Sequence, residues 1–307
     1  MRVLVIGASG VIGRAAVPAL LAAGHDVLGT ARGGEKSAAL RRLGAAPIDV
    51  DIYETSALSA AMRGCDAVVR LSTKIPPLTR MRSAAAWEET NRLRTEGARV
   101  IVDAALAAGV GTYVHESVTF VYADGGDAWI DERGPVDVVG TRLLAAVHEG
   151  EQHAGRFGSA GGRGVVLRFA GLYGADAPST TEMAHLAHRR LLARFGSGRF
   201  YSSWIYVPDA GVAVAAACGV PSGIYNVGDD EPLPYAEYLA TLARASGAAA
   251  PLRAPYFLGK LFLGEVWGYV SRSQRISNAK LRSVSSWSPA PPSAHEGFEP
   301  IAAALHA

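Results

Sequence analysis

Residues 1–32 limit most strongly what this chain can fold into. The branched apolar run at 3–6 is typical of a strand that is buried on both faces, and it leads directly into the loop Gly7-Ala8-Ser9-Gly10-Val11-Ile12-Gly13. Apolar residues then recur at helical spacing until Gly24, and a second apolar run follows at 26–31. Strand, glycine turn, helix and strand in this order predict the first unit of a dinucleotide-binding fold.

Each glycine of this loop has its own physical task. Gly7 allows the tight turn after the strand, Gly10 lets a pyrophosphate approach the backbone, and Gly13 lets the helix pack closely against the sheet. The amide hydrogens and the positive end of the helix then face the phosphates. The predicted diphosphate-binding residues are Gly7, Ser9, Gly10, Val11, Ile12 and Gly13.

The spacing Gly-x-x-Gly-x-x-Gly near the N-terminus resembles the extended and atypical short-chain dehydrogenase/reductase superfamily, often called the NAD-dependent epimerase/dehydratase family. Later segments resemble the same family in the same order. Residues 204–210 resemble its Phe-Ile-His-Val-Asp-Asp-Val turn, 223–228 its strand ending Tyr-Asn-Val-Gly, and 272–287 its C-terminal tail. This ordered series is more specific than any single motif.

The resemblance implies an α/β fold, with a Rossmann-type doubly wound parallel sheet and a smaller C-terminal substrate-binding lobe. Residues 1–170 would form the NADP-binding domain, to which the chain would return near 203–228, and residues 171–307 would mainly form the lobe. Relatives often pair through two long helices, here expected at about 84–108 and 138–154, so a homodimer is a further expectation.

The end of the second predicted strand is where such folds distinguish NAD from NADP. An acidic residue there would bind the ribose hydroxyls of NAD, whereas a basic residue accommodates the additional phosphate of NADP. No Asp or Glu occurs at 27–34, where Arg32 stands. Arg32, with Ser9 and Lys36 as further candidates, therefore predicts NADP(H) rather than NAD(H).

Two later strand ends also resemble cofactor-binding segments of the family. At 46–52 the resemblance implies that Asp51 bonds the adenine amino group and that Ile52 packs on the ring, with Asp49 as an alternative to Asp51. The strand expected at 66–73 would end beside the cofactor ribose. Its ribose-side residues would be Leu71, Ser72 and Thr73.

The catalytic residues of the family have no direct counterparts here. Alignment on Val121-Tyr122 puts the usual catalytic hydroxyl at Val118, with Ser117 and Thr119 on either side, and we favour Thr119. The family's Tyr-x-x-x-Lys pair, in which the lysine lowers the phenol pKa, would fall near Val139 and Leu143.

Other residues are therefore candidates for proton transfer. Tyr173 lies in the segment 168–174, which resembles the turn beside the nicotinamide in relatives, and Tyr122 follows the fifth predicted strand. The proton donor would be Tyr122, Tyr173, Thr119 or water. Tyr256 and Lys260 have the dyad spacing but lie far from the cofactor half, so we interpret them as a coincidence.

Composition restricts the partners. Thirty Lys and Arg against 28 Asp and Glu give a net charge of +2, which gives no reason to expect nucleic acid or a membrane as partner. Cys65 and Cys218 lack metal-ligand spacing, so no metal is expected and both should be reduced and buried.

Met1 runs directly into the first strand, which predicts a cytoplasmic protein without a signal peptide. The Ala, Gly and Arg content resembles a high-GC bacterial source.

We expect an enzyme, because the segments predicted to form a substrate pocket are retained. The first hypothesis is an NADP(H)-dependent epimerase/dehydratase-like oxidoreductase that exchanges a hydride with the ketone or alcohol of a small molecule such as a secondary metabolite. A non-redox cyclase, isomerase or dehydratase on the same fold is an alternative, and so is a non-catalytic NADP(H)-sensing module. The basic face of the helix predicted at 180–194 is interpreted as solvated rather than as a substrate grip.

Overall fold

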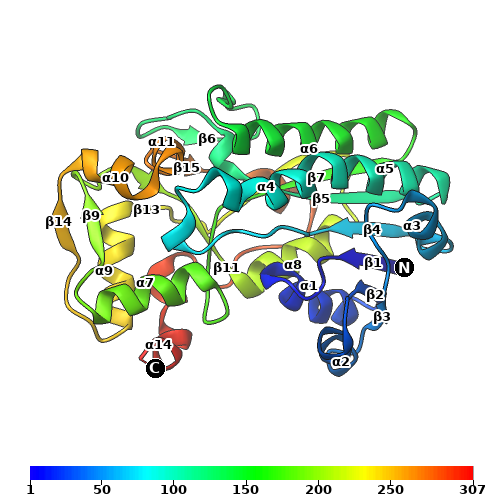
Figure 1. Cartoon of the computed structure of the whole chain (residues 1–307), viewed down its shortest axis with the longest axis horizontal. Helices are drawn as coiled ribbons and strands as arrows, with labels where there is room; N and C mark the ends of the chain where they lie inside the picture. Colours follow the sequence, from blue (N-terminus) through cyan, green and yellow to red (C-terminus); the bar gives the residue numbers. More distant parts are fainter. Residues whose placement is uncertain (307) are drawn as a thin grey trace.

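A seven-stranded parallel sheet lies at the centre of the protein, which we describe over residues 1–306 from a computed structural model (Figure 1). Its strand order is β12-β7-β5-β4-β1-β2-β3. The bounds are β1 (Arg2–Ile6), β2 (Asp26–Thr30), β3 (Ala46–Ile48), β4 (Ala67–Arg70), β5 (Thr112–Val118), β7 (Arg163–Phe169) and β12 (Gly223–Val227). The order reverses at β1, between β2 and β4. A reversal of this kind opens a crevice at the carboxyl ends of the strands, where ligands bind in doubly wound folds.

Helices cover both faces of this sheet (Figure 1). Val3 and Val5 belong to the core shared with α1 and α8, whereas Leu4 and Ile6 belong to the core shared with α3, α5 and α6. This division follows from the alternation of side chains along a strand. The helices are α1 (Val11–Ala22), α2 (Gly34–Arg42), α3 (Thr55–Met62), α5 (Ala98–Ala107), α6 (Arg142–Ser159) and α8 (Val207–Ala217).

The C-terminal half builds a smaller lobe, on the left of Figure 1. Its aromatic core includes Tyr173, Tyr238 and Phe298. Its elements are β8 (Gly171–Tyr173), α7 (Pro178–His188), β9 (Ala193–Phe195), β10 (Tyr201–Ser202), β11 (Trp204–Tyr206), β13 (Leu233–Pro234), α9 (Tyr235–Ala245), β14 (Leu252–Ala254), α10 (Tyr256–Leu263), α11 (Glu265–Val270), α13 (Ala294–Gly297), η4 (Glu299–Ile301) and α14 (Ala302–Leu305). The chain leaves this lobe to place α8 against α1 and β12 at the edge of the main sheet.

The remaining short elements are η1 (Leu78–Arg80), α4 (Ala84–Arg92), a π-helical turn at Leu93–Gly97, η3 (Thr119–Val121), β6 (Trp129–Ile130), β15 (Arg275–Ile276) and α12 (Ala279–Val284). The helix expected at 84–108 is therefore interrupted by a π turn. The helix expected from about 138 begins only at Arg142, because Gly140 has a left-handed φ of 81° and Arg272 holds the carboxylate of Asp137. The helix expected at 180–194 ends at His188, because 193–195 pairs with β14 instead.

Two simpler features complete the fold. Cys65 and Cys218 are both buried free thiols, as the sequence predicted. Within residues 1–306, no helix has the length and apolarity needed to cross a bilayer, and no group of three or more His, Cys, Asp or Glu side chains is arranged to hold a metal ion.

Candidate functional site

The loop between β1 and α1 has a shape that only glycine permits at two positions. Gly7 has a φ of 92°, and a Cβ on it would lie 2.8 Å from the backbone of both Leu71 and Ser72. A Cβ on Gly13 would overlap the carbonyl oxygen of Gly7. The glycine turn, α1 and the residues after β4 are thus in direct backbone contact. Such close packing is expected for a loop whose exposed side binds a ligand.

The N-terminus of α1 is free to bind an anion. Gly10 is the exposed N-cap residue, no side chain caps the helix, and its first turn carries no acidic residue. The first amides of a helix lack intrahelical partners and favour negative charge. The loop and α1 therefore fit the diphosphate of a nicotinamide dinucleotide.

A surface pocket of about 380 Å³ lies where the adenosine end was expected. Its lining residues are Arg32, Asp51, Tyr53, Glu88, Glu89 and Arg92. Arg92 lies 4.0 Å above the Tyr53 ring, and the Asp51 carboxylate accepts the backbone N–H of Tyr53 at 3.0 Å. The structure thus brings Arg32 and Asp51 together. No motif in the sequence indicated Tyr53 or Arg92, which come from a loop and from α4.

The three residues predicted to lie beside the cofactor ribose follow β4. Leu71 is buried, Ser72 and Thr73 are half-buried, and the backbone of Leu71 and Ser72 borders Gly7. The Ser72 hydroxyl is buried and has no hydrogen-bond partner within the described chain. A free hydroxyl at this point fits a residue that completes its hydrogen bonding with a ribose.

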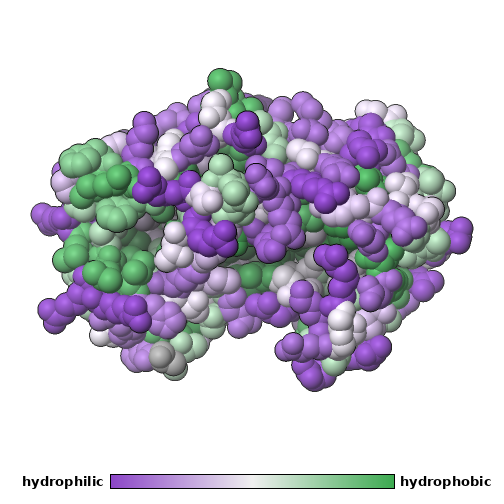
Figure 2. Space-filling view, in the orientation of Figure 1, coloured by the Kyte–Doolittle hydropathy of each residue, from purple (hydrophilic) through white to green (hydrophobic). Residues whose placement is uncertain are grey.

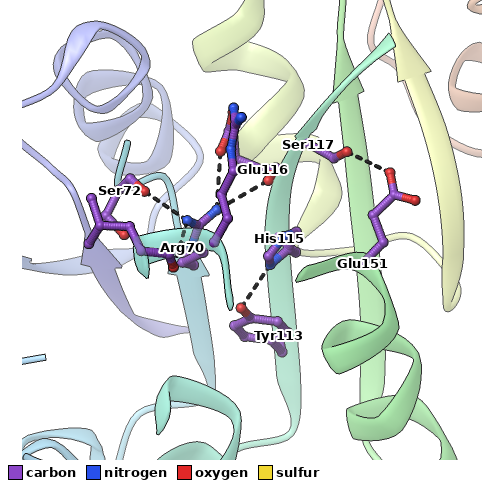
Figure 3. A network of polar contacts seen from close by, with 9 residues as sticks. Arg70, Ser72, Tyr113, His115, Glu116, Ser117 and Glu151 are labelled. Carbon is purple, nitrogen blue, oxygen red and sulfur yellow. Dashed lines mark hydrogen bonds and ion pairs between the residues drawn. The ribbon is translucent and has the colours of Figure 1, made fainter. Parts of the chain in front are cut away.

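Beside these residues lies a buried ionic cluster (Figure 3). Arg70 at the end of β4 donates to the Glu116 carboxylate at 3.1 Å and to the carbonyl oxygens of Ser72 at 2.8 Å and Leu93 at 3.0 Å. Arg94, on the π-helical turn, lies 3.6 Å from the second oxygen of Glu116. Two guanidinium groups share one carboxylate, and all three side chains are buried, so this cluster fixes the segment after β4 and presents no exposed ionic group.

A second buried pair joins β5, β7 and α6. Glu151 accepts the hydroxyl of Ser117 at 2.5 Å and two N–H groups of Arg168, each at 2.7 Å. Ser117 is fully buried, and in Figure 3 it points toward Glu151. Ser117, one of the two candidate hydroxyls next to Val118, is therefore committed to this pair.

His115 also belongs to the interior. Its Nδ1 lies 2.9 Å from the hydroxyl of Tyr113 (Figure 3). Burial, with smaller effects of Arg70 and Arg94, lowers the pKa of His115 well below its usual range. His115 is therefore neutral at physiological pH and is not a proton donor.

The predicted proton donors are buried as well. Tyr122 is fully buried and donates to the side-chain oxygen of Asn226 at 2.8 Å, and burial raises its pKa. Tyr173 is fully buried and its ring contacts those of Tyr206 and Phe298, and burial raises its pKa strongly. Thr119 is buried at the first residue of η3. A raised pKa makes a phenol a weaker acid, so burial disfavours both tyrosines as proton donors.

Apolar residues occupy the positions where the family resemblance puts catalytic groups. Val118 and Leu143 are half-buried and pack on one apolar cluster, which also contains Trp87, Val121, Leu144, Val147, Val266 and Tyr269. Val139 is 86% exposed in the segment before α6. Tyr256 and Lys260 share one turn of α10, but this helix lies in the lobe and the Tyr256 hydroxyl is 3.0 Å from that of Ser271.

Comparisons with known proteins agree with this architecture. The sequence profile of the NAD dependent epimerase/dehydratase family matches residues 3–228. A 3-diazoavenalumate denitrifying reductase from a Streptomyces species is 35% identical over 97% of this chain and 99% of its own length. A 4-hydroxy-2-methyl-3-oxo-4-farnesyl-3,4-dihydroquinoline-1-oxide ketoreductase of Stigmatella aurantiaca is 29% identical over 81% of this chain and 75% of its own.

Among solved structures, a human epimerase family protein with NADPH superposes with a TM-score of 0.80. It is 21% identical to this chain, and the superposition covers 99% of both chains. At this level of identity the similarity concerns the fold.

Proposed function

The chain belongs to the NAD-dependent epimerase/dehydratase family, and we propose that it is an NADP(H)-dependent reductase that reduces an aromatic small molecule without a tyrosine proton donor. The observation that carries this proposal is the apolar character of the three family catalytic positions, Val118, Val139 and Leu143. A nicotinamide dinucleotide bound over the glycine loop would supply a hydride.

Cofactor binding is assigned to residues around the switch point of the sheet. Gly7, Gly13 and the free first turn of α1 would hold the diphosphate, and Ser72 would meet the ribose. Arg32 is exposed beside the adenosine-side pocket and forms no ion pair within residues 1–306. An unpaired guanidinium at this point supports the preference for the additional phosphate of NADP.

The chain's own residues would exclude water and orient the acceptor instead of moving a proton. Half-buried Met81, Phe120, Val138 and Leu143 extend the apolar cluster around Val118. Glu116 and Glu151 are each paired with arginine, burial keeps His115 neutral, and burial raises the pKa of the Tyr122 and Tyr173 phenols. Such surroundings favour an acceptor that needs no acid, because general acid catalysis requires a donor within hydrogen-bond reach.

The name of the Streptomyces relative indicates one class of acceptor with this property. A ketone becomes a good hydride acceptor when its oxygen is protonated or hydrogen-bonded. An aryl diazonium group already carries a positive charge and leaves as N₂, so its replacement by hydride needs no proton. We therefore propose a diazo or diazonium arene as the substrate class, with a ring ketone as the runner-up suggested by the name of the Stigmatella relative.

The test supplies the purified protein with NADPH and either an aryl diazonium acid or a 3-oxo-3,4-dihydroquinoline-1-oxide ketone. We expect the absorbance of the reduced nicotinamide to fall with the diazonium compound, N₂ to be released, and deuterium from labelled NADPH to appear on the ring. The rate of this step should vary little between about pH 6 and pH 9, because no protein acid takes part.

Each other outcome selects a different function. Comparable turnover of the ketone with an acidic limb in the pH profile would reinstate a protein proton donor. Conversion of a substrate without any change in the nicotinamide absorbance would favour the non-redox cyclase, isomerase or dehydratase. Cofactor binding that alters only the affinity for another protein would favour the sensing module.

A further inference from the structure

Six large apolar side chains are more than half exposed on neighbouring segments of the C-terminal lobe. They are Leu191 (59%), Leu252 (52%), Tyr256 (55%), Phe257 (68%), Leu261 (52%) and Phe262 (59%). Figure 2 shows apolar residues gathered on the left of the molecule, over α10, β9 and β14. Contiguous apolar patches beyond a few hundred Å² are rare on monomeric proteins and usually mark an interaction site.

The segments that carry these side chains are fixed to each other. β14 pairs in parallel with β9, and the ring of Phe262 stacks on Phe195 with centroids 6.0 Å apart. The ring of Tyr256 packs against the buried Trp267, with ring centroids 5.2 Å apart. The exposed residues of α10 therefore lie on a folded surface, whose inner side is anchored by aromatic contacts.

Unpaired cations surround this surface. The segments 78–82, 185–199 and 250–264 contain no Asp or Glu, and their Lys and Arg residues are Arg80, Arg82, Arg189, Arg190, Arg194, Arg199, Arg253 and Lys260. Among the described residues none of these eight forms an ion pair, although exposed arginines such as Arg92, Arg99 and Arg133 do so elsewhere.

The cationic segments are adjacent in space. Arg253 is the register partner of Arg194 across β14 and β9, and a Cβ on Gly264 at the end of α10 would lie 3.5 Å from Arg82. We call the surface formed by 78–82, 189–199 and 252–264 the basic–apolar face. Since the whole chain has a net charge of only +2, the rest of the molecule is net acidic and this face is electrostatically distinct.

The positive charge of the basic–apolar face restricts which partner can bind to it. In a symmetric pair of copies the same patch would face itself, so its cations would oppose each other. A partner must therefore be anionic, and it must also accept exposed aromatic and leucine side chains. A bilayer with anionic phospholipids has both properties, because apolar side chains enter the boundary of the acyl chains while Lys and Arg bind the headgroups.

We propose that the basic–apolar face docks the protein on an anionic phospholipid membrane as a peripheral contact, with α10 lying in the interface. This differs from a membrane-spanning role, and it does not depend on the reaction proposed above. Docking would place the substrate-binding lobe, rather than the cofactor half, against the lipid surface.

Flotation of the full-length protein with vesicles tests this proposal. We expect the protein to float with vesicles of phosphatidylglycerol and phosphatidylcholine, to float less as salt is raised, and to stay unbound with phosphatidylcholine alone. The double variant Phe257→Ser/Phe262→Ser should lose flotation. Each cation removed in Arg253→Gln/Lys260→Gln should lower the partition coefficient about fivefold.

Matched variants outside the face serve as controls. Val212→Ser/Val284→Ser and Arg41→Gln/Arg63→Gln remove exposed residues of the same kinds from α8, α12, α2 and the end of α3, and they should bind vesicles like the unmodified protein. Thermal melting and NADPH affinity report whether each variant is folded, and Phe257→Ser alone replaces the double variant if that one is destabilised.

Three results would overturn the proposal. The first is an unmodified protein that does not bind anionic vesicles. The second is vesicle binding that survives Phe257→Ser/Phe262→Ser in a folded protein. The third is a concentration-dependent dimer, measured by light scattering, that this variant dissociates, because the face would then be an interface between copies.

Discussion

The glycine loop after β1 and the end of β5 lie at the same edge of one sheet, but different features of the chain define them. The loop is defined by backbone shape, because added Cβ atoms at Gly7 and Gly13 would meet neighbouring backbone. At the end of β5 the outcome depends on side chains. Val118 and Leu143 of α6 pack on one apolar cluster, and Ser117 and Glu116 belong to buried pairs. Binding of a cofactor and transfer of a proton are thus separate properties of this fold, and one can change without the other.

The largest expected effect comes from a substitution in the glycine loop. Gly13→Ala should weaken NADPH binding about hundredfold, because the new methyl group forces α1 away from Gly7. Calorimetric titration measures this change. Gly155→Ala on α6, where an added Cβ has open space, is the control and should bind like the unmodified protein. Equal affinity in the Gly13 variant would show that the diphosphate does not rest on this turn.

Arg32→Asp sharpens the comparison at the adenosine end. It should lower NADP(H) affinity about thirtyfold through loss of a charged hydrogen bond, and leave NAD(H) affinity unchanged or improved. The same titration with both cofactors gives the ratio, and Arg63→Asp is a control at a distant exposed arginine. An unchanged NADP(H) affinity would contradict the assignment of Arg32.

Asp209 is a buried acid on α8, the helix that packs against α1 beside the glycine loop. Its titration tests how this side of the sheet is stabilised. Asp209 is 6% exposed and accepts the N–H of Ala290 at 2.9 Å. Burial raises its pKa from 3.8 to about 6, so the folded protein binds a proton more tightly than the unfolded chain. The stability from this group is complete below about pH 4 and is lost as pH rises through about 6.

Asp209→Asn removes this titration but retains an oxygen acceptor. The free energy of unfolding of the variant, relative to the unmodified protein, should therefore rise by about 1–2 kcal/mol between pH 4 and pH 7. Denaturant titrations at several pH values measure the difference, with the exposed Asp127→Asn as control. A difference that does not vary with pH would mean that Asp209 is ionised over the whole range.

The smallest effect concerns the phenols beside the apolar segment. Tyr173→Phe and Tyr122→Phe should each lower the free energy of unfolding by about 1 kcal/mol, because a buried hydrogen bond is lost. Turnover should stay within about twofold. A much larger drop in kcat for either variant, with unchanged KM, would identify that phenol as the proton donor. The end of β5 would then lie beside a proton-transfer site, as in the family's usual active site.

Prediction from the sequence succeeded where the determinants are local. The strand, the glycine turn and α1 follow from spacing within a short segment, and the family resemblance correctly indicated the parallel sheet. It was less successful for the helix before Arg142, because the left-handed Gly140 and the Arg272–Asp137 contact prevent an earlier start. The end of α7 was missed because β14, some sixty positions later in the chain, recruits 193–195 into a strand pair.

The sequence by itself determined that the chain opens with a nucleotide-binding unit and that residues 27–34 contain no Asp or Glu, since both depend only on which residues are neighbours in the chain. Only the tertiary structure decided that Ser117 pairs with Glu151, that Tyr122 and Tyr173 are buried, and that cations from three distant segments share one face with α10. The physical reason is that burial and electrostatic pairing depend on distance in space. The net charge of +2 does not tell where the charged residues gather in the folded protein. A hydroxyl in a sequence motif likewise does not tell which groups lie next to it after folding.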